Sequence, residues 1–109
     1  MERLDRYRQI AQSIVDDYAK YKPSYGDVEL LVFSQLDNYL LISVGWNGDR
    51  RVHSTILHLR IMAEKFWIER DETEEGITED LLALGIPKQD IVLGFQHPAD
   101  RKLSEFAIT

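Results

Sequence analysis

The sequence predicts an α+β fold of two layers: an N-terminal helix, a four-stranded antiparallel meander, a second helix and one or more short C-terminal strands. Apolar residues recur at helical spacing over residues 2–21. Four runs of strand-forming residues then follow between residues 27 and 70, separated only by short turn signals. We expect a single domain over residues 1–109, because this length supports one continuous core and no linker, repeat or low-complexity segment interrupts it.

The first predicted helix spans residues 2–21. Its apolar stripe consists of residues spaced by three and four, with two more that widen it: Leu4, Tyr7, Ala11, Ile14 and Tyr18, then Ile10 and Val15. Such a stripe suits packing over one face of a sheet or, alternatively, against a partner helix. The segment Lys22-Pro23-Ser24-Tyr25-Gly26 is expected to end the helix, because a residue before proline is pushed out of the helical region.

The four strands are predicted over residues 27–36, 39–46, 51–62 and 66–70. The turns between them are expected at Asp37-Asn38, at Asn47-Gly48 and over residues 63–65. Asn47-Gly48 is the strongest hairpin signal, since both central residues of the favoured turn need positive φ. Alternation along the second strand places two sets of residues on opposite faces: Leu40, Ile42, Val44 and Trp46 on one, and Tyr39, Leu41, Ser43 and Gly45 on the other.

The second helix is predicted over residues 76–84, with Ile77, Leu81 and Leu84 on one face. Thr73 or Thr78 is expected to cap its first turn, and Gly85-Ile86-Pro87 to end it. A short buried strand over residues 91–95 and a turn over 98–102 follow. Residues 103–108 fit either an edge strand or a terminal helical turn.

Negative charge is concentrated between Glu69 and Asp80, where seven carboxylates accompany one base, Arg70. The local balance of −6 equals the formal charge of the whole chain. Glu72, Glu74 and Glu75 are interpreted either as a solvated face or as a binding edge for a basic partner, which such a patch would steer electrostatically. The net charge argues against tight binding to a phosphate backbone, so contact with nucleic acid is expected to be indirect.

No pattern in the sequence indicates catalysis, a cofactor or a metal ion. His53 and His58 are five residues apart on one predicted strand, so they are expected to point to opposite faces, and His97 has no partner nearby in sequence. No nucleophile elbow, phosphate loop or dinucleotide-binding glycine pattern occurs. The absence of cysteine excludes disulfides and thiolate metal sites. We predict no catalytic, cofactor-binding or metal-binding residue.

The remaining candidates are basic and aromatic. Arg50, Arg51 and His53 follow the Asn47-Gly48 turn, where they are interpreted as solubilising charges at the hairpin end or as members of an ion pair, rather than as a nucleic-acid contact. Trp46 and Trp67 are expected in the core or at an interface. The charged N-terminus lacks the apolar core of a signal peptide and the apolar runs are strand-sized, which predicts a cytoplasmic protein without membrane contact.

Three segments together resemble a known family: 21–29, 44–53, and 65–76 continuing through 85–95, with 7–10 and 106–108 fitting as well. They make the sequence similar, over nearly its full length, to the XisI family, the fdxN-element excision controlling factors of filamentous cyanobacteria. The family's motif residues map onto Trp46, Arg51, His53, Trp67, Thr73, Glu75, Gly76, Gly85, Pro87, Gly94, Phe95, Pro98 and Arg101.

The resemblance implies a non-enzymatic, regulatory role in programmed DNA rearrangement during heterocyst differentiation, where a separate site-specific recombinase cuts and joins the DNA. It also implies a partner from the companion XisH family, which looks like a restriction-endonuclease-type fold. An acidic protein could occupy the basic surface that such a partner presents to DNA. The residues expected to bind a partner are Glu72, Glu74, Glu75, Arg51, His53 and Arg101.

Two other functions are weighed against this one. The first is a direct DNA-binding accessory factor of the recombinase, acting through Arg50, Arg51, His53 and Arg101. The second is a hydrolase acting through Glu75 and His97. The sequence also predicts a homodimer, because a meander has exposed edges that must be covered or blunted, and Trp46 or Trp67 could anchor a two-fold interface.

Overall fold

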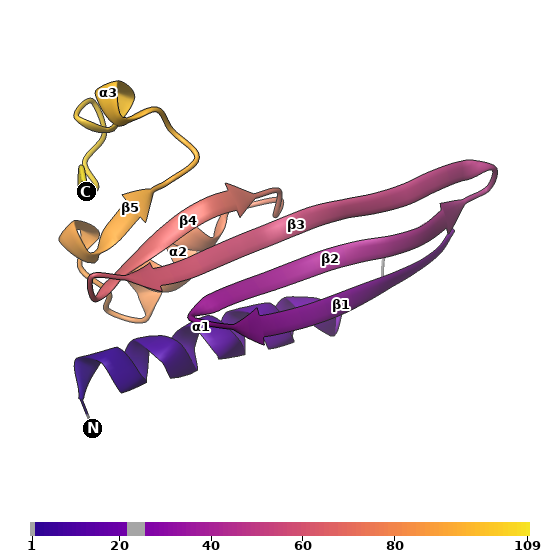
Figure 1. Cartoon of the computed structure of the whole chain (residues 1–109), viewed down its shortest axis with the longest axis horizontal. Helices are drawn as coiled ribbons and strands as arrows, with labels where there is room; N and C mark the ends of the chain where they lie inside the picture. The colour runs from indigo at the N-terminus through magenta and orange to yellow at the C-terminus, as the bar shows by residue number, and fades with distance from the viewer. Residues whose placement is uncertain (1, 22–25) are drawn as a thin grey trace.

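One five-stranded sheet organises the protein, with its strands in the order β1-β2-β3-β4-β5 (Figure 1). The computed structural model describes residues 2–21 and 26–109. The first four strands form the predicted antiparallel meander and the last joins its end in parallel: β1 (Asp27–Gln35), β2 (Asn38–Asn47), β3 (Arg50–Met62), β4 (Lys65–Asp71) and β5 (Ile91–Leu93). The β2–β3 hairpin extends well past the end of α1 (Figure 1).

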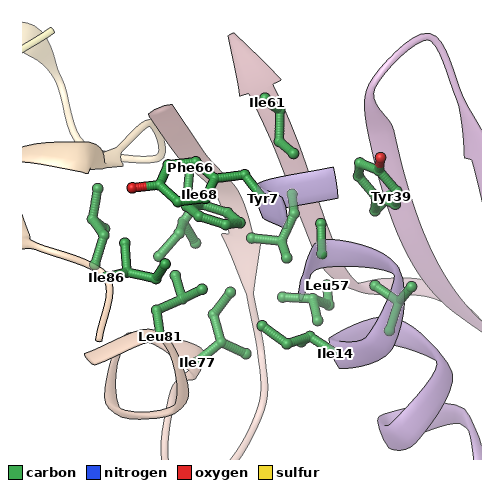
Figure 2. Close-up of a cluster of buried hydrophobic side chains, with 14 of the residues drawn as sticks. Tyr7, Ile14, Tyr39, Leu57, Ile61, Phe66, Ile68, Ile77, Leu81 and Ile86 are labelled. Carbon is green, nitrogen blue, oxygen red and sulfur yellow. The ribbon is translucent and has the colours of Figure 1, made fainter. Parts of the chain in front are cut away.

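The helices α1 (Arg3–Ala19) and α2 (Ile77–Ala83) pack on the same face of this sheet. Figure 2 shows Ile14 of α1 beside Ile77 and Leu81 of α2, with Leu57 of β3 in the same cluster. The predicted stripe of α1 is confirmed, since its central members are buried in the core: Tyr7, Ala11, Ile14 and Val15. The two-layer α+β prediction is therefore confirmed.

The hairpin turns lie one residue away from two of the predicted positions. Leu36 and Asp37, with φ of 53° and 61°, form the first turn, so the prediction of Asp37-Asn38 was wrong. Gly48 begins the second turn with φ of 65°, while Asn47 pairs with Arg50 in the ladder. The register is set by which face of β2 is buried, and a slip of one residue would move every core side chain to solvent.

Residues of β2 alternate as predicted, and Tyr39, Leu41 and Ser43 are the buried set. An extra residue in β3 interrupts the pairing, because Leu41 pairs with Leu57 while Ile42 pairs with Thr55. This bulge shifts the alternation of β3 by one. His53 and His58 therefore pair with Val44 and Leu40 on the same face, which corrects the prediction that they point to opposite faces.

The prediction that Thr73 or Thr78 caps the start of α2 was wrong. The carboxylate of Asp71 accepts the Ile77 N–H there, at 2.8 Å. At the other end, Gly85 has φ of 86°. The Ile86 N–H bonds the Leu81 carbonyl and the Gly85 N–H bonds that of Leu82, a Schellman motif.

The Schellman motif also changes which side chains reach the core. Leu84, predicted on the buried face of the second helix, is 48% exposed, and Ile86 enters the core in its place. The reversal of the chain at Gly85 turns Ile86 back toward the sheet, which the helical spacing of the sequence alone does not reveal.

The C-terminal region departs most from the prediction. After the 3₁₀ helix η1 (Lys88–Asp90), β5 ends at Leu93 rather than Phe95, and the predicted turn over 98–102 contains a short helix, α3 (Pro98–Arg101). Residues 103–108 form neither a strand nor a helix, and Ala107 alone bridges to Val92. Of the predicted turn at 22–26, residues 22–25 lie outside the described residues. Within the described chain, no helix has the length and apolar character needed to span a bilayer.

Candidate functional site

A groove of about 970 Å³ opens between α1, α2 and the sheet, next to the acidic segment. Its floor is apolar and its rim carries carboxylates. We call it the acidic groove and define it by the floor residues Ile14, Leu30, Leu41 and Ile56 and the rim residues Asp17, Glu74, Glu75 and Asp80.

Asp71 positions the loop that carries two of the rim carboxylates. One of its oxygens accepts the N–H of Thr73 at 3.0 Å and the Thr73 hydroxyl, and the other accepts the Ile77 N–H. Both ends of the loop are thereby held to one carboxylate at the end of β4. The loop places Glu74 and Glu75 on the groove.

Glu72 was predicted as a binding residue together with Glu74 and Glu75, but its side chain contacts Arg70. Its carboxylate pairs with Arg70 at 3.1 Å, and it does not line the groove. Glu74 and Glu75 form no ion pair with another residue that the structure describes. The structure therefore separates the three predicted glutamates into two on the groove and one beside it.

Tyr18 fixes one rim residue, because its hydroxyl donates to Asp80 at 2.9 Å and so joins α1 to α2. Burial, followed by the hydrogen bond to Asp80, raises the pKa of Tyr18 to about 12. The hydroxyl therefore stays protonated at neutral pH and keeps donating. Of the other rim residues, Asp17 pairs with Lys20 at 3.3 Å, one helical turn away on the exposed side of α1.

The groove combines two chemical properties that are complementary to one kind of ligand. Its floor offers apolar surface, and the carboxylates around it create a negative potential. A segment that carries apolar and basic side chains on one face matches both properties, because it buries its apolar atoms while its cations meet the rim. Clustered basic side chains are one feature of surfaces that bind nucleic acid.

The predicted basic residues lie elsewhere. Arg51 and His53 are on the outer face of β3, opposite the helices, and the Arg51 guanidinium lies 5.2 Å from the ring centre of Trp46. Arg101 of α3 lies over the ring of Trp67 at 5.2 Å and donates to the carbonyls of Leu93 and Gly94. The structure thus brings neither Arg101 nor the Arg51–His53 pair to the acidic groove.

The hydrolase alternative receives no support from the placement of its two residues. The Nδ1 atom of His97 accepts the Ala99 N–H at 3.1 Å and caps α3, whereas Glu75 is on the rim of the groove. His97 does not line the groove. Among the described residues, no group of three histidine or acidic side chains is arranged to hold a metal ion.

The sequence and the structure both relate the chain to known proteins. The family model described as XisI protein matches residues 1–108. The chain belongs to the XisI family. The resemblance carried by the sequence motifs is thereby confirmed.

Two solved structures resemble this XisI-family chain over their full lengths. A XisI-like protein from Anabaena variabilis ATCC 29413 superposes with a TM-score of 0.89, at 29% identity, over 97% of this chain and 99% of that one. The fdxN element excision controlling factor XisI from the same organism superposes with a TM-score of 0.79, at 40% identity, over 99% of this chain and all of the other. Among curated proteins, no match is found.

The sequence predicts the charge of this candidate site but not its shape. The floor residues come from α1, β1, β2 and β3, and two rim residues, Asp17 and Asp80, come from different helices. The acidic run was the one signal available, because no spacing along the chain reveals that these elements meet. Asp71 was missed as a cap because it lies six residues before the N–H that it accepts.

Proposed function

We propose that this XisI-family protein is a non-enzymatic accessory factor that controls the excision of a DNA element by binding an XisH-like, nuclease-fold partner. The family membership and the 40% identity to a protein named as an excision controlling factor support the regulatory role. The observation that carries the partner-binding mechanism is the acidic groove, with its apolar floor and carboxylate rim.

The mechanism follows from what a nuclease fold must present to DNA. Its DNA-binding surface carries lysine and arginine side chains that neutralise phosphates. A basic segment of that surface, bound in the acidic groove, is no longer available to DNA. Carboxylates on the groove also steer the partner before contact, so the association rate falls as ionic strength rises. The protein would restrain its partner by competing with DNA for the same cations.

Direct DNA binding, the alternative function, is supported less well. Arg101 is engaged with backbone carbonyls of the C-terminal region, and Arg51 lies against Trp46. The formal charge of −6 opposes approach to a phosphate backbone. Mobility shifts at low salt test this alternative, and DNA binding by the purified protein at micromolar concentration would favour it.

The experiment that tests the proposal is co-purification with an XisH-family protein from the same genome, at low and at high salt. We expect a complex that weakens as salt is raised. The double variant Glu74→Gln/Glu75→Gln should bind at least about tenfold more weakly, because two rim charges are lost. Glu72→Gln is the control, since it removes one carboxylate charge from a neighbouring residue that lies outside the groove.

Two results would contradict the proposal. The first is the absence of any complex at low salt. The second is a double variant whose affinity and salt dependence equal those of the wild type, which would show that the rim carboxylates do not take part.

A further inference from the structure

The outer face of the sheet, opposite α1 and α2, carries an apolar patch over β1 and β2. We call it the outer patch and define it by Leu31, Phe33, Leu40, Ile42, Val44 and Trp46. Phe33 is 53% exposed, Trp46 50% and Leu31 36%, while the other three are half-buried. A contiguous exposed apolar patch is a candidate interaction site.

The sequence of β1 supports the same interpretation. Residues 30–33 are apolar at every position, and so are 40–42 in β2. Strands buried on both faces have such continuous apolar runs, whereas strands with one solvated face alternate. In the structure only one face is covered, because Val28, Leu30 and Val32 turn toward α1 while Leu31 and Phe33 turn away.

The C-terminal region covers the rest of the outer face. Trp67 of β4 lies beneath Arg101, and Val92 of β5 is fully buried and bridges to Ala107. The uncovered area is therefore restricted to β1, β2 and the hairpin half of β3.

Charges around the outer patch follow a regular order across the strands. In one row of cross-strand partners, Asp27 of β1 pairs with Trp46, which pairs with Arg51 of β3. In the next row on the same face, Glu29 pairs with Val44, which pairs with His53. Each row thus has an acid on β1, an apolar residue on β2 and a basic residue on β3.

The charged members of these rows are not neutralised within the chain. Asp27, Glu29 and Arg51 form no ion pair with another described residue. The Arg51 guanidinium contacts the Trp46 ring and donates to the Gly45 carbonyl at 3.4 Å, and neither contact neutralises its charge. The acidic and basic columns are separated by β2, with neighbouring strands about 4.8 Å apart.

We propose that the outer patch packs against the outer patch of a second copy of this chain, around a two-fold axis that lies between the two sheets and runs parallel to β2. This rotation keeps each row at the same position along the strands and reverses the order of the strands. The β2 strand therefore lies over β2 of the second copy, and β1 lies over its β3. Asp27 then faces Arg51 of the second copy, and Glu29 faces His53. The apolar residues of β2 meet their own equivalents at the axis.

The order of charges selects this arrangement over the other face-to-face dimer. A two-fold axis perpendicular to the strands would lay β1 over β1 in the reverse direction, so the acids of β1 would not meet the bases of β3. Two sheets packed face to face lie about 10 Å apart with strands within about 30° of one another. The proposed contact is isologous, as a two-fold dimer requires, because Asp27 of each copy faces Arg51 of the other.

The test is a pair of charge reversals measured by light scattering on the full chain at tens of micromolar. We expect the wild type to have twice the monomer mass of 12.7 kDa. Asp27→Lys and Arg51→Glu should each weaken the dimer at least about tenfold, because each homodimer would contain two pairs of like charges. An equimolar mixture of the two variants should dimerise again, since both contacts of the mixed dimer pair opposite charges.

The mixture also separates lost folding from lost association, because a misfolded variant cannot be rescued by a second one. Lys102→Glu, a charge reversal at an exposed residue away from the outer patch, is the control and should leave the dimer intact. The proposal is overturned if the wild type is monomeric, if both single variants remain dimeric, or if the mixture stays monomeric. This inference is independent of the proposed XisH-like partner.

Discussion

At the scale of single residues, Asp71 connects the end of β4 to the start of α2. It ends β4, and its two oxygens fix the start of α2 and the loop that carries Glu74 and Glu75. Charged acceptors bonded to backbone N–H groups contribute more than neutral ones, and α2 has no other side-chain cap. The same carboxylate thus supports both the fold and the groove.

Replacing Asp71 by alanine should lower the free energy of unfolding by about 2 kcal/mol, because the N–H groups of Thr73 and Ile77 lose their acceptor. Urea denaturation measures this change. Glu72→Ala is the control, and it should change stability by less than about 0.5 kcal/mol, since Glu72 makes only an exposed ion pair with Arg70. Equal effects of the two substitutions would show that Asp71 does not hold the loop.

Tyr7 is a second residue whose chemistry can be measured directly. Its side chain is 2% exposed and its hydroxyl donates to Asp90 at 2.6 Å. Burial, followed by the bond to Asp90, raises the pKa of Tyr7 from 10.0 to about 12. The folded protein thus binds this proton more tightly than the unfolded chain does.

The stability that Tyr7 contributes is complete below pH 10 and is lost as the pH rises from 10 to 12, by an amount on the order of 2 kcal/mol. Tyr7→Phe should be less stable at pH 8, by about 1 kcal/mol from the lost hydrogen bond. It should also lose less stability between pH 9 and 11 than the wild type does. Urea unfolding at several pH values gives the change in unfolding free energy with pH for both proteins. Equal changes in the wild type and Tyr7→Phe would refute the assignment.

At the scale of elements, the pairing of β1 with β2 depends on a close approach at Gly45. A Cβ atom there would overlap the carbonyl oxygen of Asp27 on the neighbouring strand. Gly48, in the β2–β3 turn, has open space around it and only requires a positive φ of 65°. Gly45 therefore combines a steric requirement with a positive φ of 154°, whereas Gly48 has the conformational requirement alone.

Gly45→Ala should destabilise the protein by more than about 2 kcal/mol, because β1 must move away from β2 to admit the methyl group. Gly48→Ala, the matched control, should cost about 1 kcal/mol, which is the usual penalty for a left-handed residue with a side chain. Thermal or urea unfolding of both variants compares them. A larger loss at Gly48 than at Gly45 would contradict the observed register.

Most elements could be predicted from the sequence because local patterns determine them. The stripe of α1, the alternation of β2 and the glycine after α2 each act within a few residues. The errors arose where a distant contact decided the outcome. The burial of Tyr39 and Leu41 set the turn at Leu36 and Asp37, and the bulge in β3 turned His53 and His58 to one face.

The candidate site was predictable only in its charge. Glu74 and Glu75 were named from the acidic run, but their separation from Glu72 depends on where Arg70 lies. The floor of the groove requires that α1, α2 and the sheet meet, and no property of one segment reveals that contact. Residues 103–108 were left open between strand and helix because a single bridge at Ala107 has no sequence pattern.

At the scale of the whole molecule, the two candidate surfaces lie on opposite faces of one sheet. The acidic groove is on the helix face, and the outer patch is on the bare face of β1 to β3. The two proposed contacts therefore use different surfaces and do not compete with one another.

This separation makes a prediction for the assembly. Arg51→Glu should abolish the dimer but change the affinity of one chain for an XisH-like partner by less than about threefold, because the substitution lies on the opposite face of the sheet from the groove. Light scattering and a binding titration on the same preparation measure the two properties. Joint loss of both would show that the partner binds across the dimer.

The most direct test of the central claim is the dissociation constant of the XisH-like partner for three proteins: the wild type, Glu74→Gln/Glu75→Gln and Arg51→Glu, each titrated at low and high ionic strength. We predict that the double glutamine variant binds at least about tenfold more weakly and depends less on salt, whereas Arg51→Glu binds as the wild type does. If the double variant binds like the wild type at both ionic strengths, the acidic groove is not where this protein meets its partner.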